Sequence, residues 1–333
     1  MISLKARSKI LMLDRILSNE RSRTMIESDS CRYAISLRDL AQSLDLDPQK
    51  LKIQLSKISG SAWGSPTVHP ELVRELLLKR KYQYPRAQVV SIQMLKGGVG
   101  KTTTVLNLGL RAAMYGARVL FIDLDQQANL SFSLGIADET LPVWLDVVEK
   151  RKNIEECVLH VDWGLDLIPS SLNNSVLDRN LLNSNRNWAQ AIKGPLEKIR
   201  HRYDYIFIDT APALSAVNTA VTVASDLVIL PVTPDVFSYS GLTKHLEELS
   251  DIRKDFGLSF KEKVLFTRFD GRENASKEFL TKTNLEQGKS VFQNFISTSS
   301  DVKGTISGDR HLYHGKSVAK EDYDRLTREF MEI

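Results

Sequence analysis

Short apolar segments alternate with longer stretches of helical spacing from about residue 88 to residue 296. This alternation is typical of a doubly wound, mostly parallel sheet, because each connecting helix packs against one face of the sheet. We therefore predict an α/β fold, with a last helix over residues 319–333 that closes on the sheet. The apolar segments predict strands over Val89–Leu95, Arg118–Asp123, Leu165–Pro169, Tyr205–Asp209, Leu227–Pro231, Lys263–Thr267 and Val291–Ile296.

The residues before 87 show a different, mainly helical pattern. Apolar positions in residues 2–19 predict an amphipathic helix that packs either on its own domain or against a second copy of the chain. Residues 71–81 predict another helix. We therefore divide the chain into a small helical region, residues 1–86, and one large α/β domain, residues 87–333.

Two further short helices are predicted over Ile35–Leu44 and Pro48–Lys57, joined by a tight turn. Asp47 is suited to cap the second helix, and proline is favoured at the first helical position. The pair resembles a helix-turn-helix, whose second helix lies in the major groove of DNA. A purely structural hairpin is the alternative. The residues that would face base edges and phosphates are Gln49, Lys50, Lys52 and Gln54.

Net charge is divided unevenly between these two regions. The whole chain carries +4, yet residues 1–86 hold 16 Lys and Arg against 9 Asp and Glu, a balance of +7. The remaining residues hold 29 against 32, a balance of −3. A basic module beside a near-neutral domain favours a polyanionic partner, and hence DNA, over a chance variation of surface charge.

Composition excludes several classes of protein. Hydrophobic residues make up 42% and charged residues 26% of the chain, which is ordinary for a soluble globular protein. The two cysteines lack Cys-x-x-Cys spacing, which argues against a disulfide framework, a zinc ribbon or a cluster held by one chain. No apolar run approaches the roughly 18 residues of a membrane span. No signal peptide is recognisable, so we expect a cytoplasmic protein.

A glycine-rich loop, Leu95–Thr103, follows one predicted strand and precedes a helix predicted over Thr103–Tyr115. Its glycines allow backbone N–H groups to face a phosphate chain at the helix N-terminus. Lys101 would reach the β- and γ-phosphates, and Thr102 would hold Mg²⁺. Leu95 stands where the P-loop motif has its first glycine, and Lys96 is an additional lysine. The loop predicts a nucleotide site.

Carboxylates follow two other predicted strands. Asp123 and Asp125 are spaced two apart, so they lie on the same side while the chain is extended. One of them can position an attacking water. Asp209 ends an apolar strand, where a P-loop site needs a carboxylate that supports the metal. Each alone would be an ordinary strand-end acid, but the three follow the loop in the order that such a site requires.

Three segments together, Lys96–Thr103, Asp123–Asn129 and Ile206–Pro212, resemble the ParA/MinD family of deviant Walker A ATPases. Phe266–Arg272 and His314–Ser317 are similar to later motifs of this family. The resemblance spans the chain from about residue 88 to its end. The preceding helical region is similar to that of the larger plasmid-partition members, which carry a helix-turn-helix.

The resemblance implies that the chain is an ATPase that binds ATP and Mg²⁺. Lys101 and Thr102 would bind phosphate and metal within one subunit, while Lys96 would reach the phosphates of the partner in a nucleotide-sandwich homodimer. Asp125 would position the water. The resemblance further places Asp209 beside the metal and the segments Pro231–Asp235 and Thr267–Asp270, with Pro231 and Asp270 as their adenine contacts, beside the adenine. It places the phosphates on Gly97, Gly98, Val99, Gly100, Lys101, Thr102 and Thr103.

The resemblance also implies a function in DNA partition. Family members bind nonspecific DNA as ATP dimers, hydrolyse ATP slowly and are stimulated by a ParB-type centromere-binding protein, which implies a nucleoid-associated location. The N-terminal region would autoregulate an operator. Gln126-Gln127 departs from the usual Pro-Gln of the family, and residues 302–313 form a longer segment than usual. The basic residues near the C-terminus that would contact nonspecific DNA are Lys303, Arg310 and Lys316.

Three alternatives remain at this point. A MinD-like membrane ATPase would need a basic amphipathic C-terminal helix, whereas residues 319–333 are acidic, so we expect no membrane partner. An iron-protein reductase would need cluster cysteines after the loop, where only Cys157 is found. A transcription repressor with a modulatory ATP site is also compatible with the N-terminal motif, but the intact Lys101, Asp125 and Asp209 weigh against it.

Overall fold

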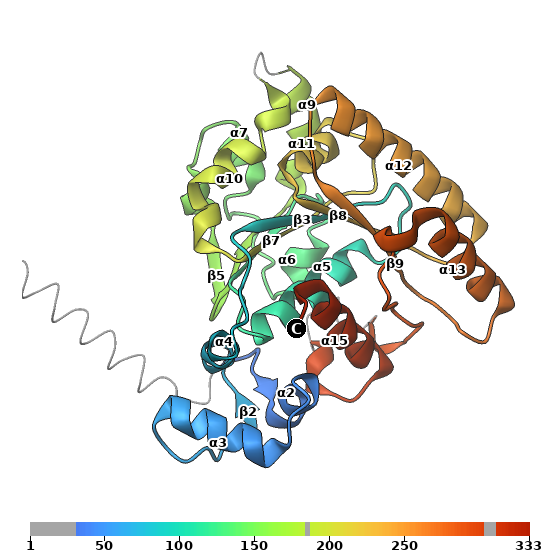
Figure 1. Ribbon diagram of the computed structural model, residues 1–333. Coiled ribbons are helices and arrows are strands. Elements are labelled where there is room, and N and C mark those ends of the chain that lie inside the picture. The colour runs from blue at the N-terminus through green and yellow to red at the C-terminus, as the bar shows by residue number, and fades with distance from the viewer. Residues whose placement is uncertain (1–30, 184–186, 303–310) are drawn as a thin grey trace, which may run out of the picture.

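The computed structural model describes residues 31–183, 187–302 and 311–333. The helix expected over residues 2–19 lies outside these ranges, as do Lys303 and Arg310. A central sheet carries helices on both faces, and a small helical region lies below it in the view of Figure 1. The predicted α/β architecture is therefore confirmed.

The sheet has seven strands in the order β5-β6-β4-β7-β3-β8-β9. All neighbours pair in parallel except β5 and β6, which are antiparallel. The sequence did not predict β5, because its side chains are only partly buried. The strands are β3 (Gln88–Ile92), β4 (Val119–Asp123), β5 (Leu159–Asp162), β6 (Leu165–Ile168), β7 (Tyr205–Asp209), β8 (Leu227–Val232) and β9 (Lys261–Phe266).

Six of the seven predicted strands are confirmed, and the one predicted over Val291–Ile296 is wrong. This segment runs beside β9 and makes only isolated bridges, such as the one between Val264 and Val291. The backbone amides of Gln293 and Asn294 donate instead to the carboxylate of Glu329, at 2.7 and 2.9 Å. The amides of Phe292 and Ile296 do donate to carbonyls of β9, at 3.0 and 2.8 Å, but the Glu329 contacts between them interrupt the ladder of a strand.

Alternate residues of the strands point to opposite faces of the sheet. Val90 and Ile92 pack on the face covered by α5 (Lys101–Met114) and α15 (Val318–Met331). The helix predicted over residues 319–333 is thus confirmed as α15. The other face carries α7 (Trp144–Val148), α8 (Ile154–Cys157), α9 (Leu177–Asn183), α10 (Lys193–Ile199), α11 (Ala216–Ala224) and α12 (Val236–Asp255).

The remaining helices are short connections or lie at the edge of the sheet. No helix in the described ranges is long and apolar enough to cross a membrane. Two α-helices complete the domain, α6 (Asn129–Ser133) and α13 (Asn274–Gln287). Five 3-10 helices join them: η1 (Leu172–Val176), η2 (Trp188–Gln190), η3 (Arg200–Arg202), η4 (Gly288–Ser290) and η5 (Leu312–His314).

The N-terminal region contains the two short helices that the sequence predicted. Asp47 caps the second helix as expected, because its carboxylate accepts hydrogen bonds from the amides of Gln49 and Lys50. A short antiparallel pair, which the sequence did not predict, brings the two ends of this region together. The elements are β1 (Ile35–Ser36), α2 (Leu37–Ser43), α3 (Pro48–Ser59), β2 (Thr67–Val68) and α4 (Pro70–Lys79).

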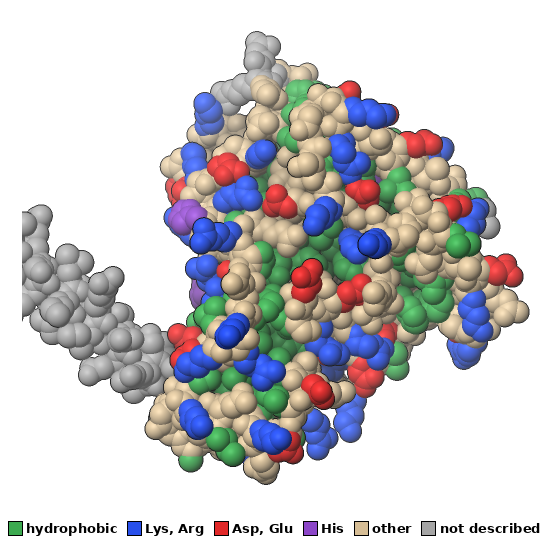
Figure 2. All heavy atoms as spheres, in the orientation of Figure 1, with side chains coloured by type: hydrophobic (Ala, Val, Ile, Leu, Met, Phe, Trp, Pro, Cys, Tyr) green, Lys and Arg blue, Asp and Glu red, His purple; other side chains and the backbone are tan. Residues whose placement is uncertain are grey.

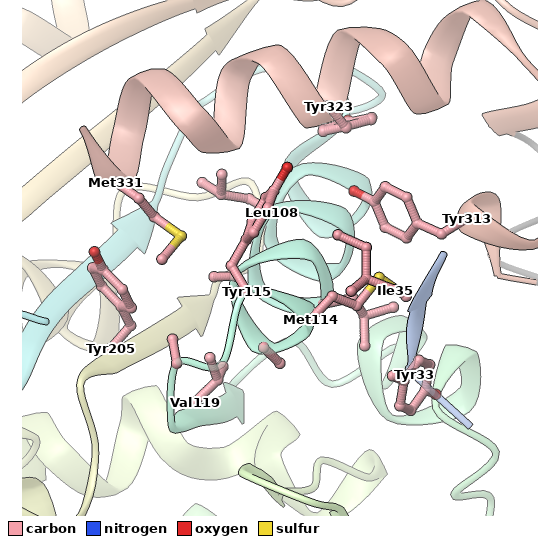
Figure 3. Close-up of a cluster of buried hydrophobic side chains, with 14 of the residues drawn as sticks. Tyr33, Ile35, Leu108, Met114, Tyr115, Val119, Tyr205, Tyr313, Tyr323 and Met331 are labelled. Carbon is pink, nitrogen blue, oxygen red and sulfur yellow. The ribbon is translucent and has the colours of Figure 1, made fainter. Parts of the chain in front are cut away.

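One hydrophobic core joins the N-terminal region to the sheet. Figure 3 shows α5 at its centre, with α15 on one side and the β1 segment on the other. Ile35 from β1 and Tyr323 from α15 belong to the same buried cluster as Met114 of α5. Helix α5, which begins at the glycine-rich loop, is therefore packed between the N-terminal region and the C-terminal helix.

A buried polar network crosses this core. Arg111 on α5 is 1% exposed and forms an ion pair with Asp324 on α15 at 2.6 Å. The hydroxyl of Tyr115 lies 2.6 Å from both Asp324 and Ser43 of α2. The network links the three helices, because its side chains come from α2, α5 and α15.

We predict that Asp324→Ala lowers the free energy of unfolding by about 3–5 kcal/mol, because it leaves the Arg111 charge buried without its partner. Urea unfolding followed by circular dichroism measures the change. The matched control is Asp251→Ala, which removes an exposed carboxylate from a surface pair with Lys254 and should cost less than about 1 kcal/mol. Equal losses in the two variants would contradict a structural function for the buried pair.

Candidate active site

A cavity of about 630 Å³ opens at the carboxyl ends of the central strands, where ligands bind in open α/β sheets. The glycine-rich loop after β3 forms one wall, and segments that follow β4, β7 and β9 form the others. Its volume suits a nucleotide-sized ligand. The lining residues are Gly97, Gly98, Gly100, Lys101, Thr102, Thr103, Asp125, Gln126, Gln127, Asn129, Ala211, Pro212, Ala213 and Arg268.

The glycine-rich loop has the conformation that the sequence predicted. Gly98 and Gly100 have φ values of 74° and 90°, a region that glycine enters without steric cost. Helix α5 begins directly after Gly100, so its unpaired N–H groups and positive dipole end lie beside the cavity. The hydroxyl of Thr267 donates to the carbonyl of Val99 at 2.8 Å and fixes the loop against β9.

Lys101 is the buried cation of this site, with 7% of its surface exposed. Burial lowers the pKa of Lys101, while the carboxylates of Asp209 and Asp125 act in the opposite direction. Within the described ranges its Nζ has one weak acceptor, the Lys96 carbonyl at 3.5 Å. A phosphate group in the cavity would supply the negative charge that a buried ammonium group requires.

Asp123 and Asp209 are directly opposite each other at the ends of β4 and β7, and both are fully buried. Burial raises the pKa of Asp123 to about 7, although the amide and hydroxyl of Ser131 both donate to it. Burial, followed by the nearby Asp123 carboxylate, raises the pKa of Asp209 well above its ordinary value. Ionising both buried carboxylates is unfavourable, so the site requires additional positive charge to keep both of them charged.

The surroundings of Asp209 fit a magnesium ion. Neither carboxylate oxygen accepts a hydrogen bond from the described residues, although the Thr102 hydroxyl is near enough to lower its pKa. Mg²⁺ prefers hard oxygen ligands and usually takes only one or two from the protein. A buried carboxylate with open oxygens beside a hydroxyl is such a donor set. Asp125 lies nearby, 8% exposed, and lines the cavity.

Lys96, the additional lysine, is held by its own subunit. Its Nζ lies 2.8 Å from both carboxylate oxygens of Asp235 and 3.0 Å from the hydroxyl of Ser238. Partial burial acts to raise the pKa of Asp235, but hydrogen bonds from Lys96 and then Thr233 hold it below its ordinary value. About a third of the Lys96 side chain remains exposed, 35%. The lysine is therefore at the surface, beside the loop and outside the cavity lining.

The structure does not bring every predicted site residue into the cavity. Pro231 is buried in β8, and Asp270 follows β9, where Arg272 binds its carboxylate at 2.6 and 2.9 Å. Both lie at the carboxyl ends of neighbouring strands, yet neither lines the cavity. The Val99 side chain is buried behind the loop and does not line the cavity, and its carbonyl accepts the hydrogen bond from Thr267.

The predicted DNA-contacting residues lie apart from the cavity. Gln49 and Lys50 are exposed on α3, and Lys52 is half-buried on the same helix. Lys316 is exposed between η5 and α15. These positions are accessible to a large ligand without any change in the nucleotide cavity.

Arg268 and Asp235 fall within the two segments expected beside the adenine, but their actual contacts could not be identified from the sequence. Arg268 lines the cavity with a φ of 51°, and the Asp235–Ser238 pair binds Lys96 from more than a hundred residues away. The segments that contain them were recognisable because both follow predicted strands. A pattern along the chain does not show which distant residues are in contact.

Comparison with known proteins assigns the family. A domain model described as an AAA domain matches residues 87–264. A ParA family protein of Chlamydia trachomatis is 33% identical over 260 residues, which cover 73% of this chain and 97% of that protein. The chromosome partitioning protein ParA of Caulobacter vibrioides is 30% identical over 249 residues, covering 73% and 93% of the two chains.

A solved structure shares the fold and the kind of ligand that the cavity suits. Cobyrinic acid a,c-diamide synthase from Mycobacterium smegmatis, with a bound ATP analogue and magnesium, is 26% identical with a TM-score of 0.63. The similarity covers 73% of this chain and 95% of that one. With the loop, the buried lysine and the paired aspartates all in place, the matched domain and the two relatives show that this chain belongs to the ParA family of P-loop ATPases.

Proposed function

We propose that the chain is a DNA partition ATPase that works as an ATP-dependent dimer. The observation that carries the proposal is Lys96, an additional lysine beside a complete phosphate-binding loop, held at the surface by a weak pair rather than inside its own cavity. A diamide synthase shares the fold, so the fold alone does not select partition. The relatives support partition, since the chromosome partitioning protein ParA of Caulobacter vibrioides and the ParA family protein of Chlamydia trachomatis each match over most of their length.

Residues of one subunit would bind the nucleotide. Backbone N–H groups of Gly97–Thr103 and the start of α5 would cradle the phosphates, and Lys101 would pair with them in place of the carboxylates near it. Thr102 and Asp209 would hold Mg²⁺, which when bound neutralises phosphate charge. Asp125 would position the attacking water, because it is the one carboxylate of the three that lines the cavity.

A second subunit would complete the site. Lys96 would leave Asp235 and reach the phosphates bound by the partner, so that charge stabilisation depends on dimerisation. ATP then acts as a switch between a free monomer and a DNA-bound dimer. A ParB-type centromere-binding protein would speed hydrolysis and release, and the protein would be cytoplasmic and associated with the nucleoid.

Two regions would contact DNA. Residues 1–86 would form an operator-binding unit in which α3 enters the major groove, while residues 87–333 form the ATPase unit. The exposure of Gln49 and Lys50, together with the half-buried Lys52, supports this placement. Nonspecific DNA would be contacted near the C-terminus, where Lys316 is exposed and where Lys303 and Arg310 are found in the sequence.

The structure weighs against a membrane-binding function for the C-terminal helix. Ala319, Tyr323 and Leu326 on the apolar face of α15 are almost fully buried against α5. A helix that binds the membrane surface must present its apolar face to lipid. That face is already used in the core, so the DNA-directed function is favoured over the MinD-like one.

We expect Lys96→Ala to abolish ATP-dependent binding to nonspecific DNA while ATP binding is retained. Gel shift with ATP measures the first, and fluorescence titration with a labelled ATP analogue the second. Lys244→Ala, which removes an exposed lysine from α12, is the control and should behave as the wild type in both assays. Retention of ATP-dependent DNA binding by Lys96→Ala would refute the dimer proposal.

Asp125→Ala should lower the rate of ATP hydrolysis by about 100-fold or more, since it removes the group that positions water. ATP binding should persist, because Lys101 and the loop are intact. Phosphate release measures the rate, and light scattering with ATP measures the mass, which should remain that of a dimer. If hydrolysis continues at the wild-type rate, another group positions the water.

The double variant Lys50→Ala, Lys52→Ala should lose protection of the operator DNA upstream of the gene while its ATPase rate stays unchanged. DNase I footprinting reads out the first property. Lys277→Ala with Lys282→Ala removes the same charge from α13 and is the matched control. An unchanged footprint in the α3 variant would show that the helix pair is a structural hairpin.

A further inference from the structure

A second large cavity lies at the opposite end of the sheet from the nucleotide site. It measures about 610 Å³ and is formed where the segment after α4 meets the amino ends of the parallel strands. Arginine and tyrosine side chains dominate its walls, among them Arg74, Tyr84, Arg86 and Arg118, with His201 at its edge. Nothing in the proposed ATPase reaction uses these residues.

Two guanidinium groups in this cavity are fixed by a single carboxylate. Asp204 is 2% exposed and accepts from Arg74 at 2.5 Å and from Arg118 at 3.3 Å. The ring of Tyr84 stacks on the Arg74 guanidinium, at 4.0 Å from its centroid. Because one negative charge serves two positive ones, the pair of arginines keeps a net positive charge with a defined geometry.

The rim of the cavity adds exposed cations that lack an acidic partner. Arg86, Arg202 and Arg80 at the end of α4 form no ion pair with the described residues, and each is exposed. Of the nearby acids, Glu75 pairs with Lys79, and Glu197 and Asp226 pair with Arg200. Glu332, which lies near Tyr82, forms no ion pair with the described residues, so it offsets one of these charges. We call these cations, together with Lys81, His201 and the Asp204-bound Arg118, the basic end surface; it consists of Arg80, Lys81, Arg86, Arg118, His201 and Arg202.

We propose that the basic end surface binds the phosphate backbone of duplex DNA and extends the contact made by α3. This inference rests on the proposed function, because it assumes that α3 contacts DNA. Helix α4 packs on α3 and ends at this surface, so the two are physically continuous. Figure 2 shows Lys and Arg side chains along the side of the molecule that runs from α3 past α4 toward β5.

The spread of the charges favours a long polyanion over a small ligand. They come from α4, the segment before β3, the start of β4 and η3, so a single phosphate contacts only some of them. Duplex DNA offers a charge about every 1.7 Å along its axis and can neutralise them together. The surface also lies at the amino ends of the strands, away from the P-loop, so this contact does not depend on nucleotide.

The test is the salt dependence of DNA binding by the full-length protein without ATP. Binding of a labelled 30-base-pair duplex is measured by fluorescence anisotropy between 50 and 200 mM KCl for the wild type and for Arg80→Ala, Arg86→Ala, Arg202→Ala combined. Each lost phosphate contact lowers the slope of log K against log [salt] by about 0.9, so we expect a decrease of about 2–3. The ATPase rate should be unchanged, which shows that the variant is folded.

Two controls separate charge from structure. The triple lysine variant, Arg80→Lys, Arg86→Lys, Arg202→Lys, should retain the wild-type slope because phosphate contacts need charge. Arg151→Ala, Lys152→Ala, Arg179→Ala removes the same charge elsewhere and should also leave the slope unchanged.

The possible results are distinguishable. If the triple alanine variant keeps the wild-type slope while Lys50→Ala, Lys52→Ala loses affinity, the basic end surface is a solvated face and the proposed function stands. If the wild type shows no binding to DNA without ATP, this inference fails, whereas the operator part of the proposed function is decided by the footprint of Lys50→Ala, Lys52→Ala. Equal loss in the charge-matched control would reduce the effect to net charge and overturn the inference.

Discussion

The parallel register of β3, β4 and β7 is the constraint on which the site depends. It sets Ile92 opposite Asp209, and Asp209 opposite Asp123, so that the carboxylates and the start of the glycine-rich loop end at one edge of the sheet. Two fully buried acids side by side are costly, and their raised pKa values express that cost. The arrangement is reasonable only for a site that receives further positive charge, which Lys101 and a bound metal ion supply.

Helix α5 connects the site to the C-terminal helix and to the N-terminal region. Its first residue is Lys101, and near its other end Arg111 and Tyr115 bind Asp324 of α15. Tyr115 also reaches Ser43 of α2, in the N-terminal region. A helix is stiff along its axis, so the glycine-rich loop and the helix pair are attached to the two ends of one rigid element. The buried network gives this attachment specific geometry, whereas apolar packing alone tolerates sliding.

Local patterns in the sequence were sufficient to predict most of the strands of the sheet. The strands beneath the site are continuous apolar runs, since both faces of the sheet are covered, and such runs are easily recognised. The strand expected over Val291–Ile296 failed because apolar side chains indicate burial and not the partner of the backbone, which for two of its amides is the Glu329 carboxylate. Strand β5 was missed for the opposite reason, since its side chains are half-exposed.

The candidate active site, too, was predictable from the sequence only in part. The loop and the acids follow from motifs that are contiguous in the chain, whereas the contact of Lys96 with Asp235 joins two motifs across 139 residues. The left-handed backbone at Arg268 also leaves no trace in residue type, because arginine has no preference for it. Residue types and their order thus predicted a site for phosphate and metal. Only the tertiary contacts show which side chain pairs with which.

The strength of the Lys96–Asp235 ion pair bears on the proposed transfer of Lys96 to a second subunit. Both side chains are more than a third exposed, and an ion pair of that kind contributes no more than about 1 kcal/mol. A polyphosphate chain carries several charges and accepts charge-assisted hydrogen bonds at each oxygen, so it competes successfully for the lysine. In the proposed dimer, this weak pair would hold Lys96 in a lone subunit without opposing its transfer to the phosphates of a second subunit. A buried pair at this position would be difficult to break and would block that transfer, which gives a physical reason for the exposed position of the pair.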